Sequence, residues 1–111
     1  MQTTRIPKPE WPDALRAFSD RNAGRRTSLE VLDPTLGAQR QQHEYQLFGV
    51  TYDPHDERVQ IMLGTFGGVG PHVTHTIGGV RAIDILSNDV GHDTTLRVEQ
   101  PDAQTLLRIE R

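Results

Sequence analysis

The fold is decided at the centre of the chain, by residues 43–63, HEYQLFGVTYDPHDERVQIML. Two stretches rich in β-branched and aromatic residues flank the polar loop 53–57, whose Asp and Pro residues are typical of a turn. After the loop, Val59, Ile61 and Leu63 occupy every second position, as in a strand with one buried face. We therefore predict that this region forms an antiparallel hairpin.

The first strand of this hairpin changes phase at Gly49. Tyr45 and Leu47 lie in one phase of the alternation before Gly49, whereas Val50 and Tyr52 lie in the other phase after it. A β-bulge at a glycine re-aims the following side chains, and burial of both faces would also permit such a pattern. The sequence leaves these two explanations open.

Upstream of this hairpin, the apolar residues recur with the period of an α-helix. Pro12 suits a first helical turn and Gly24 is placed as a C-terminal cap, which predicts a helix over residues 12–22. Apolar residues recur along it at helical spacing, namely Trp11, Ala14, Leu15 and Phe18. We interpret residues 1–10, which are polar and contain prolines, as a flexible N-terminal segment.

Strand patterns recur through the rest of the chain, and the connections between them are short. We interpret residues 33–42 as a turn followed by a polar connection. Further strands are predicted near 27–31, 72–77, 80–86, 95–99 and 106–109. Such loops are too short for parallel crossovers. We predict an α+β fold in which the N-terminal helix packs on a six- to seven-stranded, mostly antiparallel, twisted sheet or small open barrel, with residues 11–111 as one globular domain.

Composition narrows the classes of function. The chain has no cysteine and a net charge of −3, and no window approaches the ~20 apolar residues of a membrane span. Six basic and three acidic side chains lie in residues 1–26, against six basic and twelve acidic in residues 27–111. We therefore expect a cytoplasmic protein that binds neither nucleic acid nor membrane.

A glycine-rich stretch, Gly64–Pro71, could in principle bring backbone N–H groups close to a phosphate. It lacks the Gly-Lys-Ser/Thr ending of a Walker loop, and the residues that follow it are extended rather than helical. We interpret it as a flexible connection. Gly67, Gly68 and Gly70, together with His72, are candidates for a ligand or partner surface.

Three histidines are candidate metal ligands: His72, His75 and His92. On a strand, residues 72 and 75 point to opposite faces, so they could share a metal only where the backbone is bulged. His75 shares its phase with Val73 and Ile77, which favours a half-buried histidine, and His92 stands in a turn region beside Asp93. We assign no catalytic residue and no cofactor.

Short peptides along the chain carry a resemblance. Their order and spacing resemble a small bacterial domain family of unassigned function, and the peptides are residues 11–18, 36–39, 63–64, 72–75 and 105–108. The resemblance covers nearly the whole chain. It implies a stand-alone bacterial domain of about this length and brings no activity, cofactor or catalytic residues.

Two classes of function follow from these observations. The leading hypothesis is a non-enzymatic binding or protein-interaction module of the bacterial cytoplasm, whose partner is an unknown protein or a second copy paired through a sheet edge. The alternative is a small histidine-dependent metal-binding protein or enzyme, or a ligand-binding barrel, that uses His72 and His75.

Overall fold

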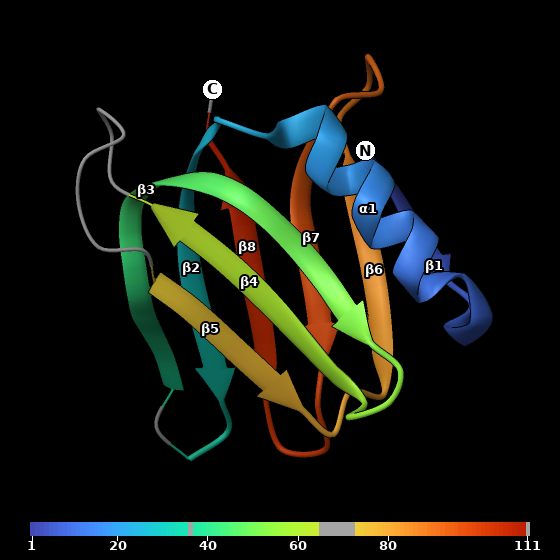
Figure 1. Cartoon of the computed structure of the whole chain (residues 1–111). Helices are drawn as coiled ribbons and strands as arrows, with labels where there is room; N and C mark the ends of the chain where they lie inside the picture. The colour runs from blue at the N-terminus through green and yellow to red at the C-terminus, as the bar shows by residue number, and fades with distance from the viewer. Residues whose placement is uncertain (36, 65–72, 111) are drawn as a thin grey trace.

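The computed structural model describes residues 1–35, 37–64 and 73–110, and for residues 38–44 it describes the backbone alone. The described residues form one α-helix, one short 3-10 helix and eight strands (Figure 1). The helices are η1 (Lys8–Glu10) and α1 (Trp11–Asn22). The strands are β1 (Gln2–Ile6), β2 (Arg26–Asp33), β3 (Gly37–Asp53), β4 (Arg58–Gly64), β5 (Val73–Gly78), β6 (Ala82–Ser87), β7 (Asp93–Glu99) and β8 (Gln104–Ile109).

The described strands belong to one sheet in the order β1-β6-β7-β8-β2-β3-β4-β5, and each recorded pair is antiparallel. Within the described ranges the sheet is open, because β1 and β5 are its two ends in this order. Figure 1 shows that it is strongly curled, so that β4 and β5 cross in front of β2 and β8 while α1 lies near β3 and β6. The predicted α+β class and antiparallel sheet are confirmed.

The strand number differs from the prediction, with eight strands in the described residues instead of six or seven. Residues 2–6, assigned above to a flexible segment, form β1 along β6. Residues 39–42, assigned to a polar connection, extend β3 along β2. Both segments are polar and carry no hydrophobic alternation, so backbone pairing with a distant strand determines their structure.

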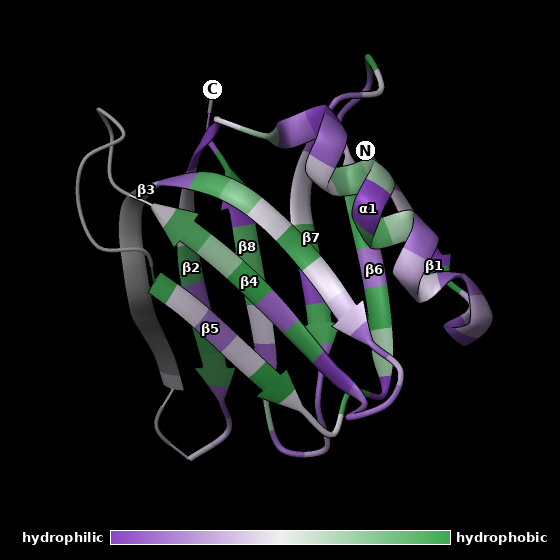
Figure 2. Ribbon diagram, in the orientation of Figure 1, coloured by the Kyte–Doolittle hydropathy of each residue, from purple (hydrophilic) through white to green (hydrophobic). Residues whose placement is uncertain are grey.

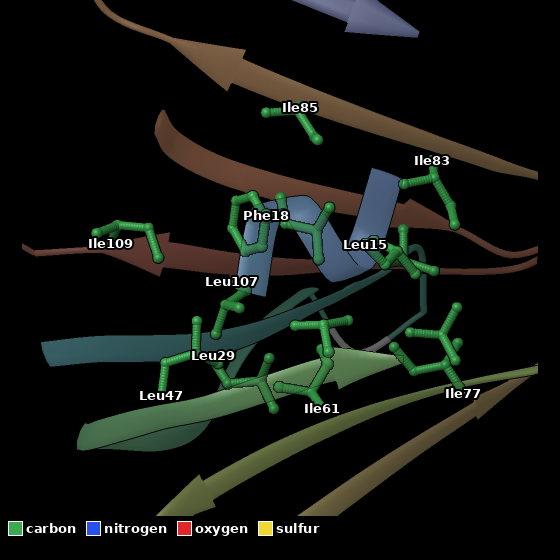
Figure 3. Close-up of a cluster of buried hydrophobic side chains, with 14 of the residues drawn as sticks. Leu15, Phe18, Leu29, Leu47, Ile61, Ile77, Ile83, Ile85, Leu107 and Ile109 are labelled. Carbon is green, nitrogen blue, oxygen red and sulfur yellow. The ribbon is translucent and has the colours of Figure 1, made fainter. Parts of the chain in front are cut away.

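The core fills the inner side of the curled sheet. Leu15 and Phe18 of α1 are fully buried, and Figure 3 shows them among side chains from strands of both halves of the sheet, such as Leu29, Ile61 and Leu107. Trp11 donates its indole N–H to the carbonyl oxygen of Ile6 at 2.8 Å. Its ring also meets that of Tyr52 edge to face, with centroids 5.2 Å apart. The apolar stripe of the helix therefore closes the core, as predicted.

The end of α1 is tied to β3 by backbone hydrogen bonds. Gly24 has a φ of +82°, the left-handed conformation that the predicted C-terminal cap requires. Its N–H donates to the carbonyl oxygen of Leu47 at 2.8 Å, and the Leu47 N–H donates to the carbonyl oxygen of Arg25 at 2.9 Å. The glycine cap thus fixes where the helix leaves the sheet.

A β-bulge lies where the sequence changes phase. The register between β3 and β4 shifts between Leu47 and Gly49, which leaves Phe48 as the extra residue. Ser19 of α1 reaches this bulge, where its hydroxyl oxygen accepts a hydrogen bond from the Val50 N–H at 2.7 Å. The same hydroxyl lies 2.7 Å from the carbonyl oxygen of Leu15, to which it can donate. The bulge explanation is therefore confirmed, and the serine side chain locks the helix to it.

Replacing this serine tests the lock. Ser19→Ala leaves the N–H of the buried Val50 without its partner, so we expect the free energy of unfolding to fall by about 1–3 kcal/mol. Urea unfolding followed by tryptophan fluorescence measures the change. Ser87→Ala, at a half-buried strand serine, is the matched control, and Ser19→Thr should restore most of the loss because it keeps the hydroxyl. Equal stability of Ser19→Ala and the wild type would contradict this role.

Candidate functional site

His75 lies in the middle of β5. It pairs across the ladder with Ile61 of β4 and is half-buried, like Val73 on the same side of the strand, while Ile77 is fully buried. Burial lowers the pKa of His75, because a charged imidazolium is poorly solvated there. The imidazole therefore lies on an apolar inner face, as the sequence phase predicts.

The other candidate ligands are not brought to His75. His92 is exposed in the connection between β6 and β7, where its backbone N–H donates to the side-chain oxygen of Asn88 at 3.0 Å. β5 is at the far end of the strand order from β6 and β7. His72 and the glycines 67, 68 and 70 lie outside the described residues. Among the residues that are described, no group of three or more His, Asp or Glu side chains could hold a metal ion.

Asp84 is a buried carboxylate that sequence analysis did not single out. Its side chain is 1% exposed and receives bonds from Arg5 Nε at 2.9 Å and from Arg97 at 2.9 Å. The hydrogen bond from Arg5 lowers the pKa of Asp84 most, and Arg97 adds to this against the opposing effect of burial. The carboxylate is thus held ionised between two cations, and we interpret it as a structural link of β1, β6 and β7.

Asp93 is the second buried carboxylate with a structural role. Its Oδ2 accepts hydrogen bonds from Arg21 Nε and from Asn22 Nδ2, both at 2.8 Å. Asn22 also donates to the carbonyl oxygen of Phe18 at 2.9 Å. These contacts join the last turn of α1 to the start of β7. Asp93, which follows His92 in the sequence, therefore anchors the helix.

In the described part of the chain, two concave surfaces lie away from β1, and another lies beside β1. One, of about 420 Å³, lies between the β2–β3 and β7–β8 turns and includes Asp33, Glu99 and Asp102. The other, of about 360 Å³, lies over the bulge between Arg16 of α1 and Met62 of β4. In neither does a described histidine face a carboxylate, so neither presents an acid–base pair.

The remaining feature is β5, which is an edge strand of the sheet within the described residues. Its residues are Val73, Thr74, His75, Thr76, Ile77 and Gly78, with no proline and no Lys, Arg, Asp or Glu. Thr74 and Thr76 are exposed. The opposite edge strand, β1, carries Arg5 in the ion pair with Asp84 and is followed by Pro7. Charges and prolines are the usual means of protecting an edge strand. Of these two edge strands, β1 contains a charged residue, Arg5, whereas β5 contains neither a charge nor a proline.

The ion pair of Asp84 predicts a pH dependence of stability. Because its pKa is lower in the folded state than the ~3.9 of an unfolded chain, its contribution is complete above that value and is lost as the pH falls through the folded pKa. We expect Asp84→Asn to lower the free energy of unfolding by about 2 kcal/mol at pH 7, and by progressively less as the pH falls below the ~3.9 of the unfolded chain.

Urea titrations between pH 2.5 and pH 7 measure this difference. Asp56→Asn removes an exposed pair with Arg58 and is the matched control, with little expected effect at any pH. A difference between Asp84→Asn and the wild type that stayed constant over the whole pH range would rule out the proposed ionised state.

Among the described residues, no helix has the length and apolar character that crossing a bilayer requires.

Comparison with known proteins identifies one family. No curated protein and no solved structure matches the chain. The model of a family of unknown function, DUF5335, matches residues 2–111, a range that includes β1 at its start. The chain therefore belongs to the DUF5335 family.

Proposed function

We propose that this protein is a non-enzymatic protein-interaction module that binds an extended segment of polypeptide along β5, as an additional strand of its sheet. The observation that carries the proposal is the unprotected edge of β5, six residues without a formal charge or a proline. In such binding, backbone hydrogen bonds supply affinity and alternate side chains supply selectivity. The bacterial cytoplasm is the proposed setting, supported by the absence of cysteine.

The composition of β5 supports this role. Valine, threonine and isoleucine favour an extended backbone, so the strand is ready to pair without a change of conformation. Its inner face continues the apolar face of β4, on which Val59, Ile61 and Leu63 are fully buried. An added strand with apolar residues at alternate positions would extend this face.

The titratable groups of the described residues favour binding over chemistry. The pKa values of Arg5 and Asp84 are shifted by their mutual ion pair, and the pKa of His75 is shifted by burial alone. Catalytic groups are usually shifted by a specific partner in a cleft that can admit substrate. The alternative that depends on His72 stays a prediction, because His72 lies outside the described residues.

A displayed library of random linear peptides tests the proposal with the whole protein as bait. We expect enriched peptides to alternate apolar residues and to protect β5 amides from hydrogen exchange. Thr76→Lys places a charge on the exposed face of this strand and should weaken binding at least tenfold in calorimetry. Thr3→Lys, at an exposed threonine of the opposite edge strand, is the matched control and should bind like the wild type.

The proposal fails if no peptide is enriched. It also fails if the enriched peptides leave the exchange of β5 amides unchanged and bind Thr76→Lys as tightly as the wild type, since the binding surface would then lie elsewhere.

A further inference from the structure

The edge strand β5 reads nearly the same in both directions. Residues 73–77 are Val-Thr-His-Thr-Ile, with a β-branched apolar residue at each end, a threonine next to it and a histidine at the centre. Figure 2 shows the same symmetry as a strand that is hydrophobic near both ends and hydrophilic in the middle. A sequence symmetric about its midpoint is complementary to itself when two copies run antiparallel.

We propose that the segment bound along β5 is β5 of a second copy of this chain, paired antiparallel about a two-fold axis that passes between the two His75 residues. This inference rests on the proposed function and names its partner. Val73 then lies opposite Ile77 of the second copy, and Thr74 lies opposite its Thr76. Cross-strand pairs of β-branched residues and of threonines are both favourable.

The alternation of faces restricts the register. Directly opposed residues of an antiparallel pair point to the same side of the sheet, so a slip by one residue would oppose an inner-face to an outer-face side chain. In the next permitted register, Thr76 lies on the axis and Thr74 is opposed to Gly78, which has no side chain to pack. The register centred on His75 is therefore the one in which every residue from 73 to 77 has a matching partner.

The interface is small. A pair of six-residue strands buries less than the roughly 1,200 Å² of a stable protein–protein interface, so we expect a weak dimer that exchanges with monomer. Covalent trapping suits such a species, and the absence of cysteine from the chain makes single-cysteine variants unambiguous.

Three cysteine variants read out the register. His75→Cys should form a disulfide-linked dimer under mild oxidation, because opposed residues of an antiparallel pair have Cα atoms about 4.5–5.5 Å apart, within the range of a disulfide. A mixture of Thr74→Cys and Thr76→Cys proteins should form the mixed dimer. Thr76→Cys alone should not, because its two copies would lie about 8 Å apart across the axis.

Thr3→Cys, at an exposed position of β1, is the control for random collision. The mixed Thr74 and Thr76 pair keeps the experiment decisive if His75→Cys folds poorly, because both threonines are exposed. Cross-linking of the mixed pair no faster than Thr3→Cys would overturn the proposal, as would equal yields for Thr76→Cys alone and the mixed pair. If β5 still bound library peptides in that case, the proposed function would stand and only the partner would be wrong.

Opposed histidines also predict that acid weakens the dimer. On β4, the strand packed against β5, the side chains that share the face of His75 are Val59, Ile61 and Leu63, and none of them carries a charge. Protonation of both imidazoles would set two like charges opposite each other, which is unfavourable. Sedimentation equilibrium should give a dissociation constant several-fold higher at pH 5 than at pH 8.

His75→Gln is the variant that separates this effect from a general response to acid. It keeps a polar side chain at the axis but cannot gain a charge, so its dissociation constant should be the same at both pH values. An equal weakening of the wild-type and His75→Gln dimers between pH 8 and pH 5 would contradict the register centred on His75.

Discussion

The structure depends on the packing of one helix face into one curled sheet. Leu15 and Phe18 are fully buried, and they fill the space between two groups of strands that meet at the pairing of β8 with β2. Because only α1 covers this space within the described residues, its position must be fixed closely. The glycine cap at Gly24 and the hydrogen bond from Val50 to Ser19 fix it at two points of β3. A β-bulge also bends its strand, and this bulge lies where β3 pairs with β4.

The two edges of the sheet meet the same physical problem in different ways. Unpaired N–H and C=O groups on an edge strand attract other strands, and a charge close by discourages them. At β1, Arg5 is held by Asp84, so one ion pair both binds the strand to β6 and places a cation at the edge. At β5 the exposed side chains are threonines, which carry no charge that would discourage pairing with another strand. The difference between the edges is the main reason for assigning binding to β5.

The structural elements that depend on neighbouring residues could be predicted from the sequence. The helix and its glycine cap follow from the period of the apolar residues, and the structure confirms them. The change of phase at Gly49 left a bulge and burial of both faces as alternatives, and the structure shows the bulge. β1 could not be predicted in this way, because its residues are polar and its partner Asp84 is 79 residues from Arg5. The symmetric order of residues 73–77 is visible in the sequence, but its meaning depends on β5 being an edge. That property comes from the topology of the whole sheet.

An uncharged edge strand is ordinarily a risk, because repeated pairing leads to fibres. Pairing about a two-fold axis removes this risk, since each copy offers one unprotected edge and the contact uses it on both copies. Further growth would have to proceed through β1, where Arg5 and the following Pro7 oppose it. The asymmetry between the two edges therefore does more than locate a binding surface. In the proposed dimer it would limit the assembly to two copies, which a chain with two unprotected edges could not do.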